Sequence, residues 1–205
     1  DIIACDECLI QNEESNAVIQ RVKELFVQYD IKPYDKTTHQ GNIKHVLTKK
    51  GYHSEEFMLC FITYQKTIKH IDQIVEILVQ EFPHIKTIIQ NINERHDNVI
   101  LGDEEKILYG QGYIYDTLLK NQYKISLKSF YQINPIQVEV LYQTAIDLAH
   151  LNQDSVVLDA YCGIGTITLS LAKHVKKVYG VEVIYQAIED AKNNALLNKI
   201  DNVDF

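Results

Sequence analysis

Hydrophobic and polar positions in the first 128 residues predict helices separated by strands. Apolar residues recur at helical spacing over residues 15–29 and again over residues 67–82, where Pro83 ends the pattern. Residues 43–50 alternate like a half-exposed strand, and residues 57–63 form a more buried apolar run. Further short strands, separated by turn residues typical of a meander, are predicted at 87–90, 99–101, 107–109, 113–115 and 124–127. This order indicates an α+β domain.

From residue 135 onward the pattern changes to a strict alternation of helix and strand. Pro135 suits the first turn of a helix, and Asn134 before it suits a helix cap. Strands are predicted at 156–158 and 178–182, each leading into a helix, and a third strand is expected to begin at 202–205. Strands that alternate with helices form a parallel sheet of the α/β class. We therefore predict two domains, 1–128 and 129–205.

The strand at 156–158 leads into a loop that carries the clearest chemical signal in the chain. Asp159 ends the strand, and Gly163 and Gly165 follow before a helix begins at Thr166. In a parallel sheet this places backbone N–H groups at the carboxyl edge, where ligands bind. A dinucleotide loop has a third glycine, and Thr168 stands at that position here. The Asp-x-x-x-Gly-x-Gly pattern instead resembles the first motif of class I methyltransferases that use S-adenosylmethionine.

Two neighbours of the glycine loop add to this interpretation. The next strand ends at Glu182, where an acid can accept hydrogen bonds from both hydroxyls of a ribose. Together, Asp159 and Glu182 favour a nucleotide-type cofactor, with S-adenosylmethionine ahead of NAD; the alternative is a glycine-rich turn that binds nothing. Cys162 lies inside the loop, beside a helix N-terminus that would lower the pKa of its thiol. A nucleophile there would compete with the cofactor for space, so a structural role is favoured for Cys162.

Composition limits the choice of partners. The chain of 205 residues is 46% hydrophobic and 23% charged, as in ordinary soluble proteins, and no apolar run approaches a membrane span. It lacks a signal-peptide pattern, so we predict a cytoplasmic protein. The net charge of −8 does not favour nucleic acid, although an average over the chain says little about one face. One basic, partly aromatic cluster could contact an RNA backbone or serve only solubility: Lys44, His45, Lys49, Lys50 and Tyr52.

Gln132, the asparagines and the cysteines can each be interpreted as ordinary structural residues. Gln132, between two bulky residues before the Asn134 cap, could belong to a plain helix entry or reach toward the cofactor. Asparagines near Gly102 indicate turn chemistry after a strand, and those between 193 and 202 suit a fraying helix end. The four cysteines, at 5, 8, 60 and 162, do not form a disulfide framework. Cys60 is expected in the core, and Cys5-x-x-Cys8 could be half of a metal site.

These segments resemble the RNA uracil-5-methyltransferases, the family that makes 5-methyluridine in ribosomal and transfer RNA. Residues 129–135 are similar to the family's Ser-Phe-Phe-Gln-x-Asn-Pro signature, and residues 159–166 are similar to its Asp-x-Tyr-Cys-Gly-x-Gly-Thr loop. The segment from 178 to 195 also matches, as do the Gly41-x-x-Lys44-His45 stretch and the run from 90 to 102. The resemblance covers most of the chain, and the tyrosine–cysteine form of the loop makes it specific.

The resemblance implies a three-part protein with an N-terminal RNA-binding β-barrel, a central domain and a methyltransferase domain. This chain would be the α+β central domain plus the first half of a class I S-adenosylmethionine-dependent methyltransferase fold, which is Rossmann-like. Gln132 would approach the methionine end of S-adenosylmethionine, Tyr161 would pack near it, and Glu182 would hold the ribose. The loop residues Asp159, Gly163 and Gly165 would complete the cofactor site. RNA is the implied partner, with ribosomal RNA favoured over transfer RNA.

The resemblance also implies features that lie partly or wholly outside these 205 residues. Cys8 falls where some members place the last of four cysteine ligands to a 4Fe-4S cluster, and the other three would lie upstream of Asp1. In the family a cysteine adds to the 6-carbon of uracil, the 5-carbon takes the methyl group, and a base removes the 5-proton. That cysteine, its glutamate partner and an Asp-Pro-Pro-type motif lie toward the family's C-terminus.

We therefore expect no catalytic residue in this chain and no methyl transfer by the chain alone. Two alternatives remain open at this point. The chain could belong to a non-catalytic RNA-binding module, or to a methyltransferase of another specificity that shares the loop.

Overall fold

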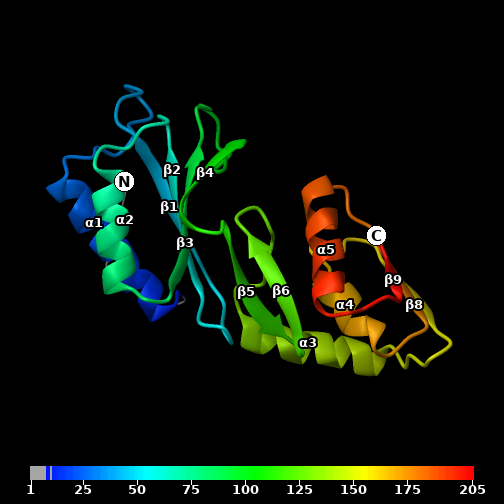
Figure 1. Ribbon diagram of the computed structural model, residues 1–205. Helices are drawn as coiled ribbons and strands as arrows, with labels where there is room; N and C mark the ends of the chain where they lie inside the picture. The colour runs from blue at the N-terminus through cyan, green and yellow to red at the C-terminus, as the bar shows by residue number, and fades with distance from the viewer. Residues whose placement is uncertain (1–7, 10) are drawn as a thin grey trace. The chain divides into compact units, whose positions relative to one another are not determined.

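The computed structural model describes residues 8, 9 and 11–205, so Cys5 lies outside the described residues. The chain divides into two compact units. The first contains the residues up to Lys50 and Glu55–Ile114, and the second contains Gly51–Ser54 and Tyr115–Phe205. Figure 1 labels the helices and strands of both units along the chain.

The first unit is built on a four-stranded sheet with the order β1-β2-β3-β4. Strands β1 (Ile43–Lys50) and β2 (Phe57–Thr63) pair antiparallel, β2 and β3 (Ile85–Ile92) pair parallel, and β3 and β4 (Glu104–Gly110) pair antiparallel. The parallel pairing requires a crossover between β2 and β3, and α2 (Ile71–Glu81) provides it. Helix α1 (Glu13–Gln28) precedes β1 in the chain.

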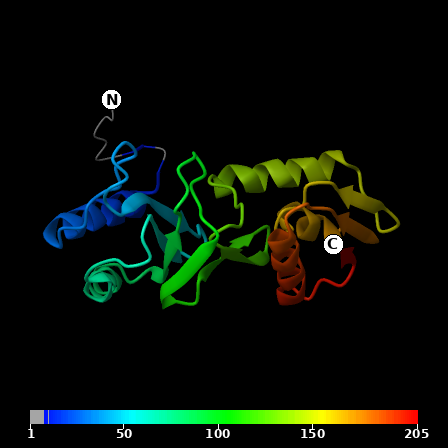
Figure 2. The ribbon, with the colours of Figure 1, turned by 90° about the horizontal axis from the view of Figure 1, so that it is seen from above.

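Helices α1 and α2 cover one face of this sheet, as both views of the ribbon show (Figure 2). The core between them contains Val18, Val22 and Leu25 of α1, Ile74 and Leu78 of α2, and Phe57, Leu59 and Phe61 of β2. The β2 residues in this set are two positions apart, so they share a face of the strand. Strand β2 is buried at every position, as its apolar run predicted.

Two parts of the sequence-based assignment were wrong. Residues 99–101 form a loop rather than a strand, and the side chains of Val99 and Ile100 are each 49% exposed. The later strands also do not form one meander. Strand β4 joins the sheet of the first unit, whereas β5 (Tyr113–Leu118) and β6 (Asn121–Ser126) form a separate two-stranded sheet. Strand pairing depends on contacts between distant residues, which the local hydrophobic pattern does not encode.

The second unit contains a parallel sheet with the order β7-β8-β9. The strands are β7 (Val156–Asp159), β8 (Lys177–Gly180) and β9 (Val203–Asp204), and the helices are α3 (Pro135–Leu148), α4 (Thr166–Ala172) and α5 (Tyr185–Leu197). A small core joins Ile146 of α3, Leu171 and Ala172 of α4, and Val178 of β8. The predicted alternation of helix and strand after residue 135 is confirmed.

Most of the β5–β6 hairpin, from Tyr115 onward, belongs to the second unit, where side chains of α5 bond the backbone of β6. Its turn residues Leu119 and Lys120 both have positive φ, which is typical of a type I′ hairpin turn. The side-chain oxygen of Asn194 accepts from the Lys124 backbone N–H at 2.8 Å, and the side chain of Asn198 bonds both backbone groups of Gln122. Along the chain, the first unit passes into the second between Ile114 and Tyr115. The domains 1–128 and 129–205 stay a prediction.

None of the helices in the described ranges combines the length and apolar character that a membrane crossing requires.

Candidate cofactor site

The loop between β7 and α4 has the backbone conformation that its glycines predicted. Gly163 and Gly165 both lie in the left-handed region, with φ of +53° and +86°, where other residues are strained. A side chain at Gly165 would come within 3.4 Å of Ala191 and Phe205, whereas one at Gly163 would meet nothing within 4 Å. Gly163 therefore leaves open space on the loop, which suits the close approach of a ligand to the backbone.

Asp159 fixes the first residues of this loop. Its Oδ2 accepts a hydrogen bond of 2.7 Å from the hydroxyl of Thr168, which is fully buried on α4. This bond explains why Thr168 stands where a dinucleotide loop has its third glycine: the side chain ties the helix back to the strand end. The backbone oxygen of Asp159 also accepts from Val181 N at 2.8 Å, which brings the two strand ends together.

Glu182 follows β8 and is held by the backbone around it. Its Oε1 accepts from Val183 N at 2.7 Å and from Ile184 N at 3.0 Å. The pKa of this carboxyl is lowered, chiefly by the Ile184 N–H, with further contributions from the N–H groups of Val183 and Gly163 and an opposing effect of burial. Glu182 is therefore an ionised acceptor beside the glycine loop.

Three side chains from other elements hold the glycine loop in place. The Tyr123 hydroxyl of β6 donates to the Thr166 carbonyl at 3.1 Å, and the Tyr142 hydroxyl of α3 lies 3.2 Å from the Thr166 hydroxyl. The Asn194 amide of α5 donates to the Ile164 carbonyl at 3.1 Å. Asn194 is fully buried, so our assignment of this asparagine to a fraying helix end was wrong. The sequence signal that could have placed Asn194 in the interior is its position at helical spacing from the apolar residues of the inner face of α5.

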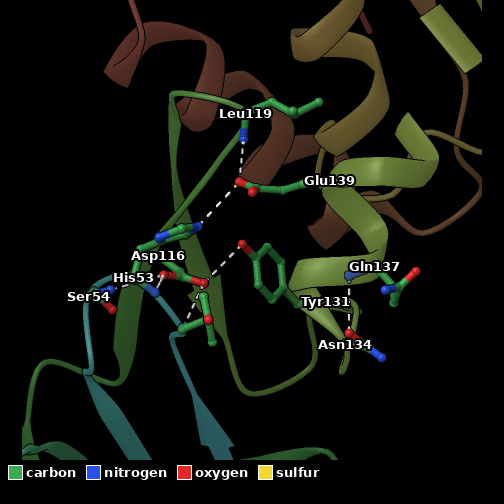
Figure 3. A network of polar contacts seen from close by, with 9 residues as sticks. His53, Ser54, Asp116, Leu119, Tyr131, Asn134, Gln137 and Glu139 are labelled. Atoms are coloured by element: carbon green, nitrogen blue, oxygen red, sulfur yellow. Dashed lines mark hydrogen bonds and ion pairs between the residues drawn. The ribbon is translucent and has the colours of Figure 1, made fainter. Parts of the chain in front are cut away.

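The segment before α3 is anchored on both sides of Gln132. The buried Ser129 hydroxyl lies 3.0 Å from Asp190 Oδ2 of α5. On the other side of Gln132, the Asn134 side chain caps α3 by accepting from Gln137 N at 3.1 Å, as its position before Pro135 predicted (Figure 3). Gln132 itself is half-buried between these anchors. Its amide is thus carried on a fixed backbone, as a cofactor contact requires.

Asp116 of β5 provides the third anchor through Tyr131. Only 1% of Asp116 is exposed, and its carboxylate accepts from the Tyr131 hydroxyl at 3.2 Å and from the backbone N–H groups of Tyr52, His53 and Ser54 at 2.9–3.2 Å. Figure 3 shows these bonds converging on one carboxylate. Burial and the neighbouring Asp116 raise the pKa of Tyr131, so its hydroxyl stays a donor. Neither Asp116 nor Asp190 was expected from the sequence.

Tyr161 and Cys162 lie in the loop with opposite environments. Tyr161 is 91% exposed, so its ring is free to pack on a bound molecule. Cys162 is buried, and burial together with Asp159 and Glu182 raises the pKa of its thiol to about 11. The expectation that the helix N-terminus lowers the pKa of this thiol was wrong. Desolvation and two nearby carboxylates outweigh the effect of the helix. The structural role that we favoured for Cys162 agrees with this environment.

These features fit S-adenosylmethionine. An ionised acid at the end of β8 offers acceptors to ribose hydroxyls, Gly163 leaves room at the loop backbone, and Tyr161 presents an exposed ring. The bond from Val181 N to the Asp159 carbonyl joins the ends of β7 and β8, so Asp159 and Glu182 follow neighbouring strands of the sheet. The cofactor contacts themselves, including those of Gln132 and Tyr161, stay predictions.

Lys44 and Lys50 of the basic cluster have structural partners within the first unit. Lys44 Nζ donates to the carbonyls of Asn93 and Arg95 at 3.1 and 2.6 Å, and desolvation lowers its pKa. Lys50 Nζ lies 2.6 Å from Glu14 Oε2, and both side chains are only 18% exposed. These bonds hold both lysines within the unit. An RNA backbone contact of the basic cluster stays a prediction.

The structure describes the environments of two cysteines of the first unit, Cys60 and Cys8. Cys60 is fully buried, and burial raises the pKa of its thiol to about 12, as expected of a core residue. Cys8 is half-buried, and Cys5 lies outside the described residues. Within the part of the chain that the structure describes, no three or more His, Cys, Asp or Glu residues are grouped to hold a metal ion. A role of Cys8 in a 4Fe-4S cluster stays a prediction.

A family model now identifies the chain. The model for tRNA (uracil-5-)-methyltransferase matches residues 56–205, which include the glycine loop, Glu182 and the segment around Gln132. The chain belongs to this family. The resemblance that we described from the sequence is confirmed.

Relatives of this chain agree with the match. A protein of Halalkalibacterium halodurans named as an uncharacterized RNA methyltransferase is 47% identical to this chain, and the match covers 100% of this chain and 44% of that protein. A protein of Streptococcus mutans with the same name is 46% identical, and the match covers 100% of this chain and 45% of that protein. One in Oceanobacillus iheyensis is 44% identical over 98% of this chain and 44% of its own length. The chain thus spans less than half the length of the curated relatives it matches.

A solved structure resembles the whole chain. The Pyrococcus abyssi tRNA (uracil-54, C5)-methyltransferase in complex with S-adenosyl-L-homocysteine has a TM-score of 0.83 and 26% identity, over 99% of this chain and 49% of that protein. The Methanocaldococcus jannaschii tRNA m1G37 methyltransferase shares the fold alone, with a TM-score of 0.51 and 14% identity over 94% of this chain and 51% of that one. The predicted class I methyltransferase fold is confirmed.

Proposed function

We propose that the protein containing this chain transfers a methyl group from S-adenosylmethionine to the 5-carbon of uridine in RNA. The observation that carries the proposal is the ionised Glu182 beside the open backbone of Gly163, in a chain of the uracil-5-methyltransferase family. Bound S-adenosylmethionine would supply an electrophilic methyl group. The residues of this chain would bind and orient that cofactor.

Each cofactor residue has a distinct proposed role. Glu182 would accept hydrogen bonds from the ribose, since two backbone N–H groups occupy its Oε1 and fix the carboxylate. Gln132 would contact the methionine end from the segment that Ser129 and Asn134 anchor. Tyr161 would cover the cofactor, while Asp159, Gly163 and Gly165 would shape the loop beneath it.

The RNA substrate is the finer part of this proposal. The sequence favours ribosomal RNA, whereas the solved relative from Pyrococcus abyssi is named for a tRNA uridine. The discriminating assay therefore offers both substrates. Full-length protein would be incubated with tritiated S-adenosylmethionine and unmodified transcripts of 23S ribosomal RNA or tRNA, and the labelled nucleoside would then be identified.

We expect label in 5-methyluridine from ribosomal RNA. Label from tRNA alone would retain the chemistry and overturn the substrate preference. Label in another nucleoside would indicate a methyltransferase of other specificity. RNA binding without cofactor binding or label would favour the non-catalytic module. A Glu182→Ala protein provides the matched control, because it removes the proposed ribose acceptor without touching RNA contacts in the first unit.

A further inference from the structure

We propose that four aromatic side chains of the first unit form a stacking surface for an unpaired RNA base. These residues, the Tyr34 cluster, are Tyr34, His39, Tyr64 and His96. The inference rests on the proposed function only in taking RNA as the partner, and it adds a contact in the first unit. Neither the cofactor site nor the core of this unit uses these side chains.

The cluster joins residues that lie up to 62 positions apart in the sequence. The Tyr34 hydroxyl lies 2.6 Å from His39 Nδ1 and 3.3 Å from His96 Nδ1. The two imidazole rings pack edge to face with centroids 4.2 Å apart, and the Tyr34 and Tyr64 rings are 4.8 Å apart. His39 and His96 are exposed, and the two tyrosines are half-buried. The tyrosines thus support imidazole rings that solvent can reach.

The loop that carries Tyr34 and His39 has a constrained backbone. Asp35 Oδ1 accepts from Thr37 N and Thr38 N at 2.7 and 2.8 Å, which closes a tight turn before His39. His39 has φ of +56°, a conformation that residues with side chains rarely adopt. A Cβ at Gly41 would lie 1.9 Å from the Pro33 carbonyl oxygen, so only glycine allows this return to β1.

The loop that carries His96 is held by the asparagines that the sequence assigned to turn chemistry. The Asn93 amide donates to the carbonyls of Val99 and Ile100 at 2.7 and 2.8 Å, and its oxygen accepts from Arg95 N at 2.9 Å. Asn91 and Gly102 exchange two hydrogen bonds of 3.1 and 2.7 Å. The family-like residues of this region thus build the backbone that presents His96.

Lys44 connects the two loops and adds charge to the cluster. Its Nζ bonds the carbonyls of the His96 loop and lies 5.1 Å from the centroid of the Tyr34 ring. Aromatic rings beside a cation suit a nucleic-acid base with its adjacent phosphate, because bases stack on such rings and the cation attracts the backbone. A base in a duplex is already stacked, so this surface would select unpaired RNA.

A metal ion is the competing occupant of a site with two imidazole nitrogens. The two Nδ1 atoms are 3.1 Å apart, but the third nearby atom is a phenol oxygen that bonds both rings. Burial and the neighbouring Tyr64 and Asp35 raise the pKa of Tyr34, so the phenol keeps its proton and is a poor ligand. These contacts favour the stacking surface.

The test measures binding of a fluorescein-labelled, mixed-sequence single-stranded oligoribonucleotide to the full-length protein by fluorescence anisotropy, without cofactor. We expect His39→Ala/His96→Ala and Tyr64→Ala each to raise the Kd about tenfold, as loss of one stacked base does. Tyr64→Phe keeps the ring and should bind like the wild type. Binding of an RNA duplex of equal length should not change, because its bases are unavailable.

Matched controls lie in the same unit. Tyr109→Ala and His84→Ala remove partly exposed rings outside the cluster, and they should leave the Kd unchanged. Titration with S-adenosylmethionine separates the two proposals: if the wild type does not bind it, the proposed function fails, while the anisotropy still decides the stacking surface.

A Kd for single-stranded RNA within twofold of the wild type in both cluster variants would overturn the proposal. An equal loss of affinity for single-stranded RNA and for the duplex in these variants would also overturn it. Titration with zinc chloride covers the metal alternative. Tight zinc binding that the double histidine variant abolishes, with RNA binding intact, would reassign the cluster as a metal site and overturn the stacking role.

Discussion

Glu182 shows how the local backbone sets the charge state of one side chain. Its carboxylate accepts two N–H groups from the residues that follow it, and these bonds favour the charged form. Its pKa is lowered, so the stabilising contribution of the charge is present above the ordinary carboxyl pKa and is lost only as the pH falls through the lowered value. The sequence could place this acid at a strand end, whereas its charge state required the structure.

Replacing Glu182 with alanine should weaken cofactor binding. We expect a loss of about 2 kcal/mol, or about 30-fold in Kd, because hydrogen bonds from the ribose to a charged acceptor disappear. Calorimetric titration of the full-length protein with S-adenosylmethionine measures this change. For the wild type, the Kd should stay nearly constant from about pH 7.5 to 5.5, since Glu182 remains ionised over that range.

Glu189→Ala is the matched control for this experiment. Glu189 lies on α5, where it pairs with Lys192 at 2.9 Å, and it is not part of the cofactor loop. A folded Glu182→Ala protein with the wild-type Kd would remove the ribose role from Glu182.

Elements of the second unit are held together by buried polar side chains as well as by apolar packing. Asp116 joins β5 to residues 52–54 and to Tyr131, and Asp190 joins α5 to Ser126 and Ser129. Asn194 joins β6, α5 and the glycine loop. Each of these side chains satisfies backbone or hydroxyl groups that would be costly to bury alone.

Removing the Asp116 carboxylate should destabilise the second unit. Asp116→Ala removes the acceptor of three backbone N–H groups and of the Tyr131 hydroxyl, so we expect a loss of about 2 kcal/mol in the free energy of unfolding. Asp116→Asn keeps an acceptor oxygen and should lose less. Denaturant unfolding of the full-length protein, followed by circular dichroism, measures both changes.

The exposed Asp201 provides the comparison for Asp116. Asp201→Ala should unfold like the wild type, since a solvated carboxylate contributes little. If Asp116→Ala were no less stable than Asp201→Ala, the converging bonds in Figure 3 would not anchor the segment around Gln132.

At the scale of the whole molecule, the described cysteines of the chain include no suitable nucleophile beside the glycine loop. Cys60 and Cys162 are buried with raised thiol pKa values, of about 12 and 11, so little thiolate forms at neutral pH. Cys8 belongs to the first unit. By the resemblance described from the sequence, we expect the family's catalytic cysteine to lie outside these 205 residues.

We therefore predict that the chain of 205 residues alone does not methylate RNA. Uracil needs a covalent partner at its 6-carbon before the 5-carbon can attack a methyl group, and positioning alone does not replace that step. The purified chain would be incubated with tritiated S-adenosylmethionine and unmodified ribosomal RNA beside the full-length protein. Label from the full-length protein alone is the expected result, and label in uracil from the chain alone would refute the prediction.

The sequence by itself determined most elements and the backbone conformation of the glycine loop. Strand β2, helix α3 and the loop from Asp159 to Thr166 follow from hydrophobic period, cap residues and glycines, which act over a few neighbouring residues. The same local signals placed Glu182 at the end of a strand. The pattern failed at residues 99–101, because Asn93 holds that apolar segment as a loop.

Only the tertiary structure decided how distant segments pair and which polar side chains connect them. It separated β4 from the β5–β6 hairpin, directed Lys44 to loop carbonyls, and made Asn194 a buried link to the glycine loop. The physical reason is common to all three. Strand partners and buried hydrogen bonds depend on residues far apart in the chain, whereas hydrophobic period and turn chemistry report only on neighbours.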